Sequence, residues 1–400
     1  MSKIIKGLKK PHRVPPDLHK QIIKRYLANR YEELVLDSEE LKHRAERLWV
    51  FDEDTSQLGP ELAEELAPLR GEDSITYSFR PSYLFKEPFV CELRDVTVAG
   101  SYATAQTFDG KFVADTISFD PYDEAYDSNR MNGAIEKTIR ATDPFLFKAL
   151  RGTPPQAADS VDVATVLHRP SNNYYHWMLE HCLKLRGVER YEAETGNNVT
   201  LIIPSNPTDW IKESIEILGF GDHTMIEWNE RKSISVNKLV VPSFPEPTPN
   251  TLSWTRQRML ENINTRNKSD DVAGVYVSRQ NSQRGRCVSN FDEVRDVLER
   301  YNIEIVCCEE LSVKEQVIMF NKANVIIGPH GAGLTNIIWG ENKHVIELFN
   351  GWVSTPYYIL SHILGDKYDG ILAEPDNSAN RTDRRNWDLI VDADELADRL

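Results

Sequence analysis

An imidazole and a carboxylate stand four residues apart near the start of a helical pattern, as His176 and Glu180. Residues at this spacing share one face of a helix, and Ser171 or Asn172 is suited to cap its first turn. Such a pair can accept a proton from a hydroxyl. Glu180 is the first candidate because a carboxylate with a pKa of about 4.3 is ionised at pH 7, and His176 is the second. The same spacing is also common on surface helices that have no catalytic role.

A second candidate site is a turn of small residues between an apolar run at 325–327 and a helical pattern at 333–339. The absence of bulky side chains would let backbone N–H groups at the start of that helix approach an anion, which the helix dipole favours. A phosphate group fits this chemistry. The residues predicted to hold it are His330, Gly331, Ala332, Gly333, Leu334, Thr335 and Asn336.

Charged side chains follow neighbouring predicted strands. Arg279 comes directly after the strand pattern at 272–278, and Arg286 is close behind; guanidinium groups suit a pyrophosphate. Glu347 ends a later strand and suits ribose hydroxyls. A solvated surface position explains Arg286 equally well. The dinucleotide fingerprint requires a third glycine where Asn336 stands, so the pattern favours a sugar-nucleotide or mononucleotide over NAD.

Alternating strand and helix patterns position these groups. They run from 161 to 242 and again from 252 to 372, which indicates parallel α/β sheets. The segment 242–249 contains four prolines and predicts a semi-rigid linker and hinge. The predicted divisions are a helical extension with a basic N-terminus over 1–70, an N-terminal α/β domain over 71–245 and a C-terminal Rossmann-like domain over 246–400.

The composition limits the classes of partner. A length of 400 residues fits two domains. The net charge of −15 argues against nucleic-acid binding. No apolar run reaches the roughly 20 residues of a membrane span, and we expect a cytoplasmic protein. Residues 1–25 hold eight Lys or Arg and one acidic residue. This segment is predicted to contact an anionic membrane surface peripherally, with a solvated tail as the alternative.

Several motifs occur in a fixed order along the chain: Asn-Tyr-Tyr-His-Trp-x-x-Glu at 173–180, Val-Tyr-Val-Ser-Arg at 275–279, Glu310-Leu-Ser with Gln316, Gly-Pro-His-Gly-Ala-Gly-Leu-Thr-Asn at 328–336 and Val-Ile-Glu-Leu-Phe at 345–349. Each motif is weak alone, but as a set they resemble the family-61 glycosyltransferases over roughly residues 160–350. The resemblance implies the GT-B arrangement, in which two Rossmann-like domains face each other. The first would then be the acceptor side and the second would bind the nucleotide-sugar.

The resemblance also implies a reaction. An inverting hexosyl- or pentosyltransferase would move a sugar from a nucleotide-sugar, usually a UDP-sugar, to a hydroxyl of a glycan, glycolipid or glycoconjugate. Polysaccharide biosynthesis at the cytoplasmic face of a membrane would fit. Arg279 and the turn 330–336 would hold the pyrophosphate, and Glu347 would lie near the ribose. Glu310 and Leu311 would line the uracil site, and His176 with Glu180 match the family's His-x-x-x-Asp/Glu pair, in which many relatives have Asp.

The leaving pyrophosphate must be stabilised by a metal or by fixed cations. The matched region contains no Asp-x-Asp motif at a strand end, and no cluster of zinc ligands stands near His176 and Glu180. Arg279 and Arg286 are therefore predicted to act without a protein-bound metal, with Mn²⁺ or Mg²⁺ as the alternative. Two other functions stay open: a non-catalytic nucleotide- or glycan-binding protein with a transferase fold, and a Rossmann-type nucleotide-sugar-modifying oxidoreductase.

Overall fold

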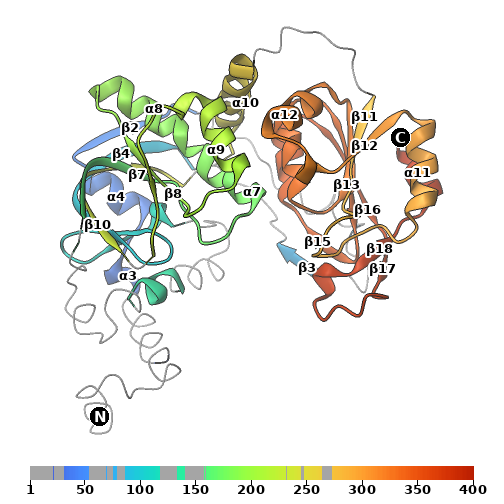
Figure 1. The fold of residues 1–400 in the computed structure, drawn as a ribbon, viewed down its shortest axis with the longest axis horizontal. Coiled ribbons are helices and arrows are strands. Elements are labelled where there is room, and N and C mark those ends of the chain that lie inside the picture. The colour runs from blue at the N-terminus through green and yellow to red at the C-terminus, as the bar shows by residue number, and fades with distance from the viewer. Residues whose placement is uncertain are drawn as a thin grey trace.

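The computed structural model describes residues 21, 31–53, 69, 75–78, 86–117, 133–139, 157, 159–230, 232–244, 247–263 and 273–400. Two large sheets organise this part of the chain, and Figure 1 shows them as two groups of elements with α10 (Pro249–Ile263) beside the junction. The fold is mixed α/β with parallel sheets, as the alternating pattern predicted. The basic N-terminal segment 1–25, except residue 21, lies outside the described residues, and so do residues 54–68 and 70–74.

The first sheet has nine strands in the order β1-β6-β5-β4-β10-β7-β8-β9, with β2 paired to β4. β10 runs antiparallel to β4 and parallel to β7, so the sheet is mixed: β10, β7, β8 and β9 are parallel to one another, and β1 is parallel to β6 at the other end. Its strands are β1 (Val35–Leu36), β2 (Arg47–Val50), β4 (Phe89–Ala99), β5 (Thr104–Gln106), β6 (Phe112–Val113), β7 (Asp159–Val166), β8 (Thr200–Ile203), β9 (Met225–Glu227) and β10 (Ser233–Pro242). Its helices are α3 (Tyr31–Leu34), α4 (Ser38–Arg44), η3 (Ala114–Thr116), α7 (Tyr174–His176), the π-helix η5 (Trp177–Cys182), α8 (Lys184–Thr195), α9 (Asp209–Ile215) and the π-helix η6 (Glu216–Phe220).

The second sheet is parallel throughout, in the order β12-β11-β13-β14-β16. Its strands are β11 (Gly274–Val277), β12 (Ile303–Val306), β13 (Val325–Pro329), β14 (His344–Phe349) and β16 (Lys367–Leu372). Its helices are α11 (Phe291–Arg300), η7 (Cys308–Glu310), α12 (Val313–Lys322), η8 (Ala332–Trp339), α13 (Pro356–Leu364), η9 (Arg384–Asn386) and α14 (Ala393–Arg399). Two separate two-stranded sheets are formed by β3 (Ile75–Ser78) with β15 (Trp352–Ser354), and by β17 (Glu374–Asp376) with β18 (Asp388–Ile390).

The sequence explains why the second sheet lies inside its helices. β13 is an apolar run whose last four residues are buried, as expected for a central parallel strand covered on both faces. α11 buries Val294, Val297 and Leu298, which recur at helical spacing and form one apolar stripe. This packing leaves the strand ends, and the loops that follow them, as the places where polar groups gather.

The two halves are joined through helices. Trp177 of η5 and Val277 of β11 belong to one continuous cluster of buried apolar residues, which runs from the first sheet to the second. In the same region the Glu213 carboxylate of α9 accepts hydrogen bonds from the backbone N–H groups of Val313 (2.8 Å) and Lys314 (3.1 Å). Because these N–H groups belong to the first turn of α12, a side chain of one half caps a helix of the other.

Three predictions of local structure need correction. Residues 47–50, predicted as helical, form β2 because β4 offers it a free edge and pairs with it. The segment 333–339 is a 3₁₀-helix rather than an α-helix; the Asn336 side chain donates to the Gly333 carbonyl (3.0 Å), which the next α-helical turn would otherwise occupy. β3 falls within the range predicted for the first domain but pairs with β15 of the second half.

We expect the substitution Glu213→Gln to lower the free energy of unfolding by about 0.5–2 kcal/mol, because the cap that it gives α12 loses its charge. The matched control is Glu216→Gln, one turn farther along at an exposed position, which should change stability by less than about 0.5 kcal/mol. Urea unfolding curves of both variants measure the difference. Equal midpoints for the two variants would contradict the capping role.

Candidate functional site

The second sheet reverses its winding direction between β11 and β13. The chain passes from β11 outward to β12, then returns to β13 and continues to β14 and β16. Ligands of open parallel sheets bind beyond the carboxyl ends of the strands at such a switch point. Arg279 follows β11 at this edge and His330 follows β13. The fold therefore brings together two residues that the sequence predicted for one site, which we call the switch-point site.

The Arg279 guanidinium is fixed by the loop that follows β11. It donates hydrogen bonds to Ser282 Oγ (2.9 Å) and to the Gly285 carbonyl (3.2 and 3.3 Å). A Cβ atom at Gly331 would lie 2.3 Å from Arg279 Nη1, so no residue with a side chain fits there unless Arg279 moves. The first glycine of the turn thus makes room for a cation of the protein itself. Burial lowers the pKa of Arg279 from its ordinary value, with Glu309 acting in the opposite direction.

Arg286 reaches the same place through an unusual backbone. Both Gly285 and Arg286 have positive φ angles, of 75° and 62°, which turn the loop sharply. The guanidinium lies over the Trp352 ring, 5.8 Å from its centroid, and its buried Nε has no hydrogen-bond partner among the described residues. Burial, followed by the nearby Arg279, lowers the pKa of Arg286 to about 10. Two partly buried guanidinium groups that repel each other favour an anionic ligand.

His330 is held between aromatic rings beside these cations. Its ring makes an edge contact with Trp352 at 4.9 Å between centroids and lies 5.5 Å from Tyr357. Its Nδ1 is 2.5 Å from Glu347 Oε1. Burial lowers the pKa of His330 from its ordinary value; Glu347 acts in the opposite direction, and Arg286 and Arg279 reinforce the decrease.

The structure corrects the role predicted for Glu347. Its side chain is 0% exposed, and Oε2 accepts a hydrogen bond from the Tyr368 hydroxyl (2.6 Å), while Oε1 faces His330. A carboxylate with both oxygens engaged inside the sheet does not reach a ribose. Tyr368, which follows in β16, gave no sequence signal because its pairing with Glu347 arises only from the parallel register of β14 and β16.

The turn 330–336 is also more structural than predicted. A Cβ atom at Gly333 would lie 2.6 Å from Val277 Cγ1, so this glycine allows close packing of η8 on β11. Leu334, Thr335 and Asn336 are all fully buried, and only Ala332 and Gly333 are partly exposed. Side chains from 334 to 336 therefore do not face a ligand.

Asn336 uses its buried amide to connect four groups. Its Oδ1 accepts hydrogen bonds from Tyr174 Oη (2.9 Å) and Trp339 Nε1 (2.7 Å). Its Nδ2 donates to Gln316 Oε1 (2.8 Å) and to the Gly333 carbonyl (3.0 Å). Tyr174 begins the helix that carries His176, so this amide ties the switch-point turn of the second half to the candidate catalytic helix of the first.

Glu310 and Leu311 lie at the carboxyl end of β12, next to the loop that follows β11. Glu310 is exposed and accepts a hydrogen bond from Asn281 Nδ2 (3.3 Å). Leu311 is half-buried, and its carbonyl accepts from Gln316 Nε2 (3.1 Å). Both residues thus border the switch-point site. A uracil ring, which the sequence predicted beside them, would meet the apolar side chain of Leu311 and the polar side chain of Glu310.

The first half contributes the second part of the site. Asn173 caps α7 by accepting from the His176 backbone N–H (3.3 Å), and the helix continues as a π-helix that carries Glu180. His176 Nδ1 bonds Glu180 Oε1, as the four-residue spacing predicted. Glu180 Oε2 accepts a hydrogen bond from Arg169 Nη1 (3.2 Å). Sequence reasoning missed Arg169, although its place directly after the predicted strand 161–167 was a usable signal.

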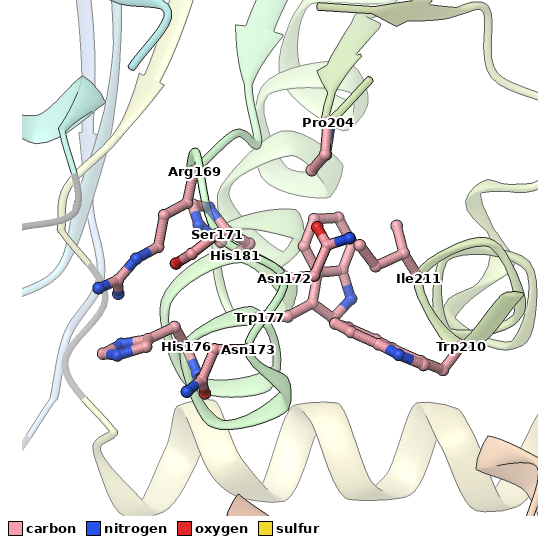
Figure 2. Close-up of a pocket in the computed structure, with 10 residues that line it drawn as sticks. All are labelled: Arg169, Ser171, Asn172, Asn173, His176, Trp177, His181, Pro204, Trp210 and Ile211. Carbon is pink, nitrogen blue, oxygen red and sulfur yellow. The ribbon is translucent and has the colours of Figure 1, made fainter. Parts of the chain in front are cut away.

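A hollow of about 210 Å³, open to solvent, adjoins this group at the carboxyl ends of β7 and β8. Figure 2 shows Arg169 and His176 pointing to one side of the 171–173 loop, while Trp177 and Trp210 lie on the other. The hollow is lined by Arg169, Ser171, Asn172, Asn173, His176, Trp177, His181, Pro204, Trp210 and Ile211. His181 is buried, and neither ring nitrogen has a hydrogen-bond partner among the described residues. Burial, followed by Lys184 and Arg169, lowers the pKa of His181 well below its ordinary value, which keeps the ring neutral.

Two negative findings concern the described residues. They contain no group of three or more His, Cys, Asp or Glu side chains that could hold a metal ion. At the switch-point site the carboxylate of Glu347 is engaged by His330 and Tyr368, and the side chains of Arg279 and Arg286 are cationic. None of the described helices has the length and apolar character required to cross a membrane.

Comparisons with known proteins gave the following results. No curated protein matches the chain. One solved structure that is similar in part is the dodecameric iron-containing heptosyltransferase TibC in complex with ADP-D-β-D-heptose, at 10% identity and a TM-score of 0.27. The match covers 51% of this chain and 64% of that one, so the chain spans less than two thirds of the length of this structure.

The family model described as Glycosyltransferase 61 matches residues 174–346. This range contains His176, Glu180, Arg279 and the turn after β13, and it ends one residue before Glu347. The match confirms the resemblance drawn from the motifs: the region 174–346 resembles the family-61 glycosyltransferases.

Proposed function

We propose that this protein is an inverting glycosyltransferase that takes a sugar from a nucleotide-sugar, with a UDP-sugar as the first candidate, and places it on a hydroxyl of a glycan or glycoconjugate. The observation that carries the proposal is the pair of partly buried guanidinium groups, Arg279 and Arg286, at the switch point of a parallel sheet. Such a pair offers several charge-assisted hydrogen bonds to a diphosphate. The family match supports glycosyl transfer as the reaction.

The proposal assigns the two halves different tasks in a GT-B arrangement. The second half, from about residue 246, binds the donor nucleotide at the carboxyl ends of β11 and β13. The first half presents His176 and Glu180 to the acceptor from the carboxyl end of β7. The contact between Tyr174 and Asn336 supports this division because it places the two strand-end regions against each other.

The geometry favours His176 over Glu180 as the base that receives the acceptor proton. Both Glu180 oxygens are engaged, one by His176 and one by Arg169, and its side chain is 10% exposed against 21% for His176. A carboxylate can only accept, so His176 Nδ1 carries a proton toward Glu180 and Nε2 keeps its lone pair. Glu180 then orients the ring and stabilises the imidazolium that forms, which reverses the order given by the sequence alone.

The leaving group has its own requirement. As the bond between the anomeric carbon and the diphosphate breaks, negative charge grows on the phosphate oxygens. Arg279 and Arg286 are already fixed by the loop 282–285 and by the Trp352 ring, so they can stabilise this charge without reorganising. A divalent metal brought in with the nucleotide would add to the same effect.

We expect Arg279→Gln to weaken UDP binding about tenfold or more, because a charge-assisted hydrogen bond contributes about 1.5–3 kcal/mol. Gly331→Ala should cause a similar loss although it removes no charge, since its Cβ would displace the Arg279 guanidinium. The φ angle of Gly331 is 174°, which any residue adopts, so backbone strain does not contribute. Isothermal titration calorimetry with UDP measures both variants.

The matched control is Arg284→Gln, an exposed arginine of the same loop. It should bind UDP within about threefold of the wild type, because a solvated charge contributes little. If Arg279→Gln binds UDP as tightly as Arg284→Gln does, the donor assignment fails. Binding of NAD in place of UDP would favour the oxidoreductase instead.

The pH dependence of turnover separates the two candidate bases. A base must be deprotonated, so kcat/KM should fall as the pH drops through its pKa. The ordinary pKa is about 6.5 for an imidazole and about 4.3 for a glutamate. The substrate is the UDP-sugar that the protein turns over. We expect the acidic limb of the profile near the imidazole value, and we expect His176→Gln to abolish that limb. Glu180→Gln should lower kcat by about a hundredfold or more.

An acidic limb near pH 4.3 that persists in His176→Gln would show that Glu180 is the base. If the protein binds UDP but transfers no sugar and hydrolyses none, the non-catalytic alternative gains. Normal UDP affinity in His176→Gln is the necessary control, because a base that acts on the acceptor hydroxyl need not contribute to donor binding.

A further inference from the structure

Tyr368, Glu347 and His330 form a hydrogen-bonded chain that the proposed reaction leaves unassigned. It runs from β16 through β14 to the loop after β13, with contacts of 2.6 Å and 2.5 Å. Glu347 is fully buried and Tyr368 is partly buried. Glu347 and Tyr368 lie beyond the range of the family match, so nothing in that match assigns them a role.

The hydrogen bonds from Tyr368 to Glu347 and between Glu347 and His330 determine which ring nitrogen of His330 is available. An ionised carboxylate has no proton to give, so the hydrogen between Glu347 and His330 belongs to Nδ1. The His330 side chain keeps 11% of its surface exposed, and Nε2 is the ring nitrogen that Glu347 does not engage. His330 precedes Gly331, and the Arg279 guanidinium lies against Gly331. We therefore assign His330 Nε2 to the switch-point site.

We propose that Glu347 and Tyr368 are positioning residues that hold His330 as a proton-accepting ligand of the donor diphosphate. The inference depends on the proposed function only through the diphosphate. When the diphosphate binds, Nε2 takes one proton from solvent and donates a hydrogen bond to a phosphate oxygen. Glu347 balances the charge of the resulting imidazolium, and no bond to carbon forms or breaks in this step.

The charged groups around His330 fit this behaviour. Arg279 and Arg286 from the loop after β11 oppose a positive ring, Glu347 from β14 favours it, and Tyr357 from α13 and Tyr368 from β16 contribute hydroxyls. Burial and the two arginines keep the ring neutral at pH 7 in the free protein. A bound diphosphate would offset the arginines, so protonation then becomes favourable.

The test is the number of protons taken up when UDP binds at pH 7. It is obtained from calorimetric titrations in two buffers with different enthalpies of ionisation. We expect the wild type to take up more protons than Glu347→Gln and His330→Gln, and UDP to bind each variant about tenfold more weakly. Free UDP carries the same number of protons in every experiment, so the difference between proteins reports on the protonation of the complex. The double variant should be no weaker than either single variant, because the two residues act as one unit.

Tyr368→Phe separates positioning from simple packing. It removes the hydrogen bond to Oε2 but keeps the negative charge, which makes Glu347 a stronger partner for an imidazolium. We expect lower thermal stability together with undiminished proton uptake. A merely structural network would instead give the same result for Tyr368→Phe and Glu347→Gln, since both disturb the same packing.

The control is Asp369→Asn, which removes the carboxylate that His344 bonds at 2.7 Å between the same two strands. It should not change the proton uptake. If the wild type binds UDP but Glu347→Gln takes up the same number of protons with the same affinity, the inference is overturned and the proposed function stands. If the folded wild type binds no nucleoside diphosphate from a panel of UDP, GDP, CDP and ADP, the two fall together.

Discussion

The buried amide of Asn336 is the interaction on which the geometry of both candidate sites depends. It receives hydrogen bonds from Tyr174 and Trp339 and donates to Gln316 and Gly333, so its hydrogen-bonding capacity is used completely. An unpaired amide in this environment would cost about 1–3 kcal/mol, so each partner is held at the place where the amide needs it. One of those partners begins the helix of the catalytic pair, and the amide itself belongs to the turn of the switch-point site. A displacement of either region therefore disturbs the other.

Two histidine–carboxylate pairs, one in each half, can serve opposite electrostatic tasks. His176 is paired with Glu180, whose other oxygen accepts a hydrogen bond from Arg169, and in the proposed reaction His176 receives the proton of the acceptor hydroxyl. His330 is paired with Glu347 but stands beside two guanidinium groups, where a leaving diphosphate would gain charge. The chemistry of displacement needs a base on one side and a positive field on the other. The same residue pair can supply both because its surroundings, rather than its identity, decide which charge state is favoured.

The sequence predicted the elements better than the roles of the residues within them. Apolar runs and helical spacing located β13, β14 and α12 within a few residues, because burial on a parallel sheet leaves a strong periodic signal. The four-residue spacing also predicted the contact of His176 with Glu180. Glu347 could not be interpreted correctly from sequence, since its burial depends on Tyr368, a partner 21 residues away that only the sheet register brings near. The helical prediction for residues 47–50 was wrong for a similar reason. These residues form a strand because they pair with β4, and no local sequence pattern contains that information.

The glycines in the turn after β13 illustrate how a pattern of small residues can have a physical cause other than the predicted one. Small residues there suggested that a ligand approaches the backbone closely. In the structure the space above Gly331 is filled by the Arg279 guanidinium, and the space above Gly333 by the Val277 side chain. The turn is thus small because the protein packs its own cation and its own core against it. A cation fixed in this way before any ligand arrives loses little entropy on binding and needs no rearrangement as negative charge develops. The glycines therefore contribute to anion recognition indirectly, by determining where the positive charge is held.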